Sequence, residues 1–113
     1  MTLETAKLLK ENGWDKETEK VWCETWNNLA EQRTWDIHYY DENDKVNPQI
    51  FSPSLEELLA VMPEVVICKI NNTYQVIYYA DSPLRTFTTD FVADPTEAVA
   101  QLWLQLKEEK LIT

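Results

Sequence analysis

The sequence has one glycine, one histidine and two cysteines among its 113 residues. A loop that cradles phosphate with main-chain amides needs several glycines close together, so that kind of nucleotide site is excluded. A zinc site needs about four cysteine or histidine ligands at paired spacings, which three scattered residues do not supply. Hydrolase, phosphoryl-transfer and dinucleotide-binding signatures are absent as well. We therefore expect no catalytic residue, no cofactor, no metal and no enzyme activity.

Basic residues are scarce: 10 stand against 20 acidic ones, for a formal net charge of -10. Direct nucleic-acid binding and attachment to an anionic membrane both need positive charge, so neither is expected. No apolar run approaches the ~20 residues that span a bilayer. An acidic surface can imitate DNA phosphates, but the acids are spread along the chain, which favours the simpler interpretation that they keep the protein soluble.

Cys23 and Cys68 lie far apart and form no CxxC pair, which is typical of buried thiols in a reducing compartment. The opening MTLETAKLLKENG reads as a helix start and lacks the apolar core of a signal peptide. With 44% hydrophobic residues and too little glycine for a flexible linker, the chain predicts a single domain over residues 1–113. A cytoplasmic location is expected.

Three helices are predicted. The first begins after Thr2 and stops at Gly13, which sits where a helix end needs a left-handed residue, so that Trp14 folds back onto Leu9. The other two begin with a capping side chain followed by proline, a residue best tolerated in the first helical turn. Their caps, prolines and ranges are Ser52 with Pro53 in 51–63, and Asp94 with Pro95 in 93–109, where Glu97 completes a capping box.

Residues 20–26 fit two structures. A strand puts Trp22, Glu24 and Trp26 on one face; a helix over 16–32 also aligns the two tryptophans. Aromatic and β-branched content favours the strand, followed by a loop or helical turn over 27–32. Further strands are predicted at 34–41, 65–70, 73–80 and 85–92, the middle two joined by a hairpin turn at Asn71-Asn72.

The predicted order is α-β-β-α-β-β-β-α. Helices interspersed with antiparallel hairpins indicate the α+β class, with three helices packed on one small antiparallel sheet of about four or five strands. His38, on the second strand, is the only partner for a cysteine nucleophile; neither cysteine sits in an electropositive setting, so a surface or core histidine is favoured. The acidic run from Asp41 to Asp44 lacks the glycine and glutamate of a calcium loop and predicts a turn.

The remaining signal is aromatic. Tryptophan is enriched at interface centres but is also highly buried in cores, and most of these rings are expected in the core. If one exposed partner-binding patch exists, the face of Trp22 and Trp26 is the candidate. On the 73–80 strand, alternate faces carry Tyr74, Val76 and Tyr78, or Gln75, Ile77 and Tyr79, which indicates a sheet covered on both sides, or covered once and adhesive once.

LETAKLLKENGW, FSPSLEELLAVMPE and the closing DPTEAVAQLWLQLKEE occur in this order along the chain. In this respect it resembles a group of small uncharacterised proteins of phages, prophages and gut bacteria and, more distantly, the phage ABA-sandwich domains. The shared residues are capping and core residues, so the resemblance implies architecture and a bacterial or phage cytosolic origin, with no catalytic residues to carry over. Residues 15–50 match the pattern poorly.

These observations predict a non-enzymatic phage or prophage accessory protein that binds an unknown protein partner. The alternative from another class is an acidic inhibitor that mimics DNA toward a nucleic-acid-binding host enzyme. An unpaired edge strand would make a homodimer natural.

Overall fold

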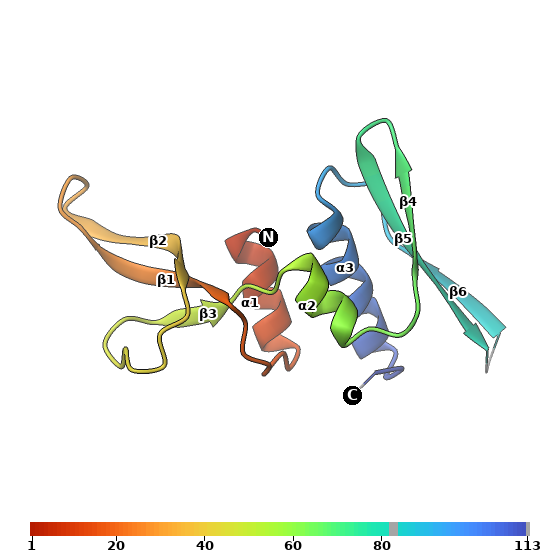
Figure 1. Cartoon of the computed structure of the whole chain (residues 1–113), viewed down its shortest axis with the longest axis horizontal. Coiled ribbons are helices and arrows are strands. Elements are labelled where there is room, and N and C mark those ends of the chain that lie inside the picture. The colour runs from red at the N-terminus through yellow and green to blue at the C-terminus, as the bar shows by residue number, and fades with distance from the viewer. Residues whose placement is uncertain (82–83, 113) are drawn as a thin grey trace. The chain divides into compact units, whose positions relative to one another are not determined.

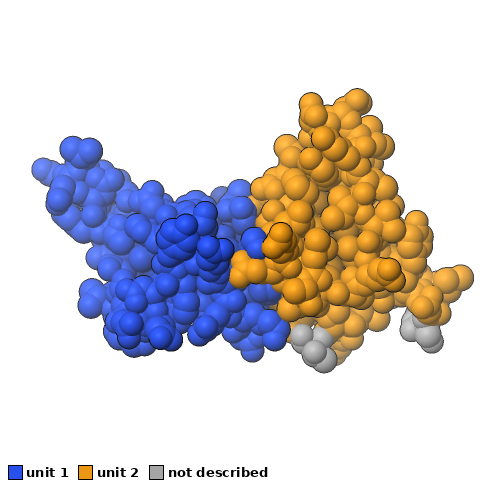
Figure 2. Space-filling model, in the orientation of Figure 1, with its two compact units in different colours: residues 1–54 blue, residues 55–113 orange. Residues whose placement is uncertain are grey.

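The computed structural model describes residues 1–81 and 84–112. Within it, the chain divides into two compact units, residues 1–54 and residues 55–113, shown in separate colours in Figure 2. Each unit is described here by itself, and the single domain expected over 1–113 stays a prediction.

The α+β class and the three helices are confirmed (Figure 1). Instead of one sheet of four or five strands, the described residues form two antiparallel three-stranded sheets, ordered β2-β1-β3 and β4-β5-β6. Unit 1 contains α1 (Leu3–Glu11), β1 (Lys20–Asn27), β2 (Gln32–Tyr39) and β3 (Gln49–Phe51). Unit 2 contains α2 (Leu55–Ala60), β4 (Val66–Ile70), β5 (Thr73–Asp81), β6 (Leu84–Thr88) and α3 (Pro95–Glu108).

The end of α1 is the left-handed stop that the single glycine predicts. Gly13 has φ 100°, a region that side chains with a Cβ avoid. Its N–H donates to the Lys10 carbonyl at 3.1 Å, and the Trp14 N–H donates to the Leu9 carbonyl at 2.9 Å. These two bonds are those of a Schellman motif, which satisfies the last carbonyls of the helix. At the other end, the Thr2 hydroxyl accepts a hydrogen bond from the Thr5 N–H, as predicted.

The strand at residues 20–26 is confirmed, and with it the hairpin of β1 and β2, whose second strand starts two residues earlier than the predicted 34–41. The short strand β3 was not predicted. Three residues are too few to show a period, and Pro48 stands directly before them.

The prediction for Ser52 is wrong. Ser52 does not cap α2; its N–H continues the edge of the sheet, donating to the Lys20 carbonyl at 3.1 Å and to the Thr18 hydroxyl at 3.3 Å. The helix begins at Leu55, so Pro53 precedes its first turn and is buried. The chain at Ser52 stays extended because it continues the pairing of β3, although the local sequence favours the start of a helix there.

In unit 2, β4 and β5 form the predicted hairpin. Asn71 and Asn72 have φ 49° and 62°, the two left-handed positions of a type I′ turn. The third strand is shorter than the predicted 85–92, because β6 ends at Thr88; Val92 rejoins the sheet as an isolated bridge to Tyr74.

Helix α3 begins as predicted, with the Asp94 carboxylate accepting a hydrogen bond from the Thr96 N–H at 2.9 Å and proline in the first turn. It packs on β5 and α2 (Figure 1). The buried side chains of this helix are Ala98, Val99, Ala100, Leu102, Trp103 and Leu106. They meet the inner face of the sheet, where the buried residues are Val76, Ala80 and Phe87.

Candidate functional site

The sequence candidate, the face of Trp22 and Trp26, is divided by the fold. On β1 these residues alternate with Val21 and Cys23, which are buried. Trp22 is half-buried, and its indole N–H donates to the Met1 carbonyl at 3.3 Å. Trp26 lies toward the free end of the hairpin and is 57% exposed. One face of β1 thus belongs to the core, while only part of the other face is covered.

Charged groups stand beside Trp26. Arg33, its register partner on β2, bonds through Nε to a Glu24 carboxylate oxygen at 3.0 Å and through Nη2 to the Glu24 carbonyl at 2.7 Å. The same Nη2 lies 2.7 Å from the Asn47 side-chain oxygen. Interface centres are usually poor in charge, so the ion pair beside Trp26 counts against this exposed ring as the centre of a contact.

A second exposed surface lies in unit 2. We call it the outer face: the side of the β4-β5-β6 sheet opposite the buried residues that meet α3. Strand alternation and register give its members, Val66, Cys68, Ile70, Thr73, Gln75, Ile77, Tyr79, Asp81, Leu84, Thr86 and Thr88. Four large apolar side chains on it are open to solvent: Val66 at 48%, Ile70 at 53%, Tyr79 at 57% and Leu84 at 85%. The sequence leaves open whether this sheet is covered on both faces or on one. In the structure it is covered on one.

The outer face is poor in charge. Asp81 is its only ionisable carboxylate and it carries no basic residue, whereas 27% of the whole chain is charged. Beside it opens a groove of about 520 Å³, within the ~300–1,000 Å³ of typical ligand sites. The groove is lined by Pro63, Glu64, Val65, Val66, Tyr78, Tyr79 and Asp81. A charge-poor sheet face with an adjoining groove suits contact with another macromolecule.

The fold brings His38 and one of the two cysteines considered from the sequence onto one face of the β1–β2 hairpin. His38 pairs with Val21 and is therefore a diagonal neighbour of Cys23 on one face of the hairpin. Burial raises the pKa of the Cys23 thiol, the charge of Asp44 raises it further, and Arg33 opposes them. A nucleophilic cysteine needs a lowered pKa, and both burial and the charge of Asp44 act against one at Cys23. His38 is exposed, and Cys68, expected to be buried, is half-buried.

The acidic run is the predicted turn. The Asp41 carboxylate accepts a hydrogen bond from the Asn43 N–H at 2.9 Å. The Asp44 carboxylate accepts from the Val46 and Asn47 N–H groups, both at 3.0 Å. These bonds, those from Asn47 first, lower the pKa of Asp44. Over residues 1–81 and 84–112, no group of three or more histidine, cysteine or acidic side chains is arranged to hold a metal ion.

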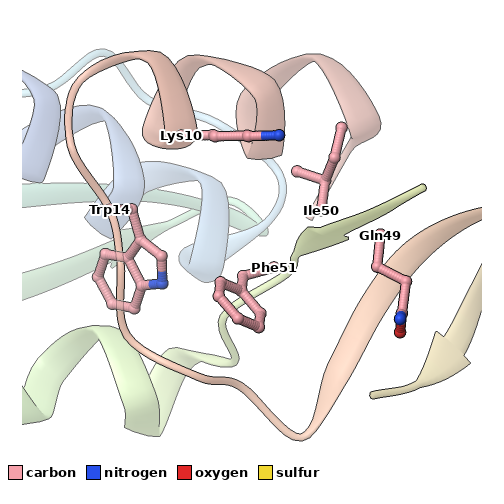
Figure 3. Close-up of a pocket in the computed structure, with 5 residues that line it drawn as sticks. All are labelled: Lys10, Trp14, Gln49, Ile50 and Phe51. Atoms are coloured by element: carbon pink, nitrogen blue, oxygen red, sulfur yellow. The ribbon is translucent and has the colours of Figure 1, made fainter. Parts of the chain in front are cut away.

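Unit 1 contains a small cavity that the sequence did not reveal (Figure 3). It measures about 110 Å³ and is lined by Lys10, Trp14, Gln49, Ile50 and Phe51. The side-chain amide of Gln49 is bonded to the main chain of Asp41, at 2.8 and 3.1 Å, and is directed away from the Trp14 ring. The volume is about a third of the lower bound for sites that enclose a drug-sized ligand, so the cavity has room only for a small apolar group.

Comparison with protein-family models, with curated proteins and with solved structures gives no match. Among the described residues, no helix has both the length and the apolar character needed to cross a membrane.

Proposed function

We propose that the chain is a non-enzymatic protein-binding module, a cytoplasmic accessory protein of the phage or prophage type, and that the outer face contacts the partner. The observation that carries this proposal is the uncovered, charge-poor side of the β4-β5-β6 sheet. Large contiguous apolar patches are uncommon on monomeric soluble proteins, and where they occur they commonly mark interaction sites.

The composition of the outer face supports the same proposal. Interface centres are depleted in charged residues and enriched in tyrosine, and Tyr79 stands on the central strand with Leu84 and Ile77 on neighbouring outer-face positions. Because the strands are held by their own ladder, binding requires no ordering of a loop, which keeps the entropic penalty of association low.

The test is a tagged pull-down from host lysate, with and without nuclease, read by mass spectrometry. Tyr79→Lys places a charge at the centre of the outer face and is expected to abolish enrichment of a specific, nuclease-resistant protein. Tyr39→Lys is the matched control: Tyr39 is a strand tyrosine of unit 1, 69% exposed, and its replacement is expected to leave the partner in place.

Equal enrichment by wild type and Tyr79→Lys would contradict the outer face as the binding surface. A DNA-handling enzyme captured equally by wild type and Tyr79→Lys would instead support the alternative, acidic mimicry of DNA. Circular dichroism of each variant checks that the substitution has not unfolded the sheet.

A further inference from the structure

We propose that β4 pairs edge to edge with β4 of a second copy of this chain, antiparallel and about a two-fold axis, so that two three-stranded sheets become one sheet of six. The inference rests on the geometry of the edge and goes beyond the proposed function, since copies that bound no other protein would pair in the same way.

The turn of the hairpin determines which main-chain groups of β4 are open. In a two-residue type I′ hairpin, the residues that flank the turn, Ile70 and Thr73, form a hydrogen-bonded pair, and pairs alternate from there. Lys69 and Ile67 therefore direct their N–H and C=O groups away from β5. The same alternation is seen on β5. Tyr74, opposite Lys69, directs its N–H and C=O away from β4 and bonds with Val92 at 2.7 and 2.9 Å.

The edge also has little protection against pairing. Edge strands are commonly blocked by proline, by a bulge or by several charges. β4 reads VICKI, with Lys69 as its only charge and no proline, and five consecutive residues pair with β5 in unbroken register. Val66, Ile67 and Ile70 are 48%, 38% and 53% exposed, so β4 offers apolar side chains as well as free main-chain groups.

Charge complementarity favours a second copy of the chain as the partner of β4, and it favours antiparallel over parallel pairing. Glu64 lies just before β4 and Lys69 near its end, so antiparallel pairing brings the basic end of each strand to the acidic end of the other. Parallel pairing would put like charges together. A chain with a net charge of -10 repels itself over most of its surface, whereas β4 contains no acidic residue.

The most complementary register places Ile67 on the two-fold axis. Lys69 then lies opposite Val65 of the second copy, one residue from Glu64, which stands in the bend before the strand, and Ile67, whose main-chain groups are open, meets Ile67 of that copy as a hydrogen-bonded pair. The ammonium of Lys69 lies 5.7 Å from the centre of the ring of Tyr74, its register partner on β5. Two short strands make an interface below about 1,200 Å², so a weak, concentration-dependent dimer is expected.

Sedimentation velocity from about 10 µM to about 1 mM tests the proposal over the range of weak association. The wild type is expected to shift from monomer to dimer. Lys69→Pro removes an outward N–H without touching the β4–β5 ladder, and because each change acts twice in a symmetric pair, the dimer is expected to weaken at least about tenfold. Thr86→Pro, at an outward position of the opposite edge strand β6, is the matched control and leaves dimerisation unchanged.

A charge exchange provides a second, independent readout. Glu64→Lys and Lys69→Glu each put like charges together and are expected to weaken the dimer about threefold or more. The double variant restores attraction with the wild-type net charge. A monomer throughout the concentration range overturns the proposal, as does a dimer that Lys69→Pro leaves intact, one that Thr86→Pro disrupts equally, or a double variant no better than the singles.

Discussion

The two sheets have the same number of strands but are covered differently. In β2-β1-β3, one face is met by Met1, whose carbonyl accepts the Trp22 indole bond, and by Lys7 of α1, whose ammonium lies 5.5 Å from the Trp35 ring. The other face is approached by the chain before β3, where Tyr40 meets Phe51 edge to face at 5.2 Å. In β4-β5-β6, α3 covers one face, and on the outer face Val66, Ile70, Tyr79 and Leu84 are open to solvent.

The difference shows what strand alternation can and cannot specify. Alternation separates two faces, but both faces of β5 carry large side chains, so the pattern alone does not say which one a helix will bury. That choice depends on where the neighbouring helix packs. The exposure of Ile70, Tyr79 and Leu84 is therefore a result of tertiary structure, and a surface that remains apolar after folding is available for contact with another chain.

The largest expected effect is on the covered side of unit 2. Leu102 is fully buried on α3, so Leu102→Ala removes apolar contacts and leaves a cavity, and we expect the free energy of unfolding to fall by about 2–5 kcal/mol. Leu84→Ala, on the outer face at 85% exposure, is the control, with a change within about 0.5 kcal/mol. Urea titration followed by tryptophan fluorescence measures both. Similar losses for the two variants would mean that the outer face is covered in solution.

The turns of the two units provide the next comparison. Gly13→Ala forces a Cβ into the left-handed region at φ 100°, and we expect it to reduce the free energy of unfolding by about 1–2 kcal/mol. Asn72→Gly, at φ 62° in the type I′ turn of unit 2, suits the same region and should be close to neutral. Thermal melts of both variants check this. A neutral Gly13→Ala would contradict the Schellman end of α1.

Much of this architecture could be predicted because its signals are local. The stop at Gly13, the cap at Asp94 and the turn at Asn71-Asn72 each depend on a few adjacent residues whose backbone preferences agree with the fold. The pairing of strands depends on distant residues, and so the division into two sheets and the short strand β3 were missed. Ser52 shows the conflict directly, since a good capping residue is used instead to extend a sheet edge.

The candidate site could be predicted only in part, for the same reason. Trp22 and Trp26 were correctly placed on one face of a strand, but their different exposure depends on the distant chain end, since the Trp22 indole bonds to Met1 while Trp26 lies toward the free end of the hairpin. The outer face was present in the sequence as the alternation of Gln75, Ile77 and Tyr79. Its mark in the sequence is that these three alternate residues carry no charge. This becomes informative only once the opposite face of β5 is known to be buried.

A smaller effect is expected for the reactivity of the two cysteine thiols, one in each unit. Cys23 is buried in unit 1 and its pKa is raised, while Cys68 on the outer face is half-buried. Alkylation by iodoacetamide, followed by mass spectrometry, should modify Cys68 at least about tenfold faster, a difference of about 1.4 kcal/mol in activation free energy. Cys68→Ser and Cys23→Ser assign the two rates. Faster modification of Cys23 would contradict its burial on the inner face of β1.

The smallest expected effect concerns the Asp44 turn of unit 1. Hydrogen bonds from Asn47 and Val46 lower its pKa in the folded chain, so folding favours the ionised carboxylate. The stabilisation is therefore present above the pKa of the unfolded carboxyl, about 3.9, and is lost as the pH falls through the lower folded value. Asp44→Ala should be slightly less stable than wild type at pH 7, and the gap should close in acid. Asp81→Ala, on the outer face of unit 2, is the control without these bonds. If the loss of stability in Asp44→Ala persisted unchanged in acid, the side chain would act through packing and not through its charge.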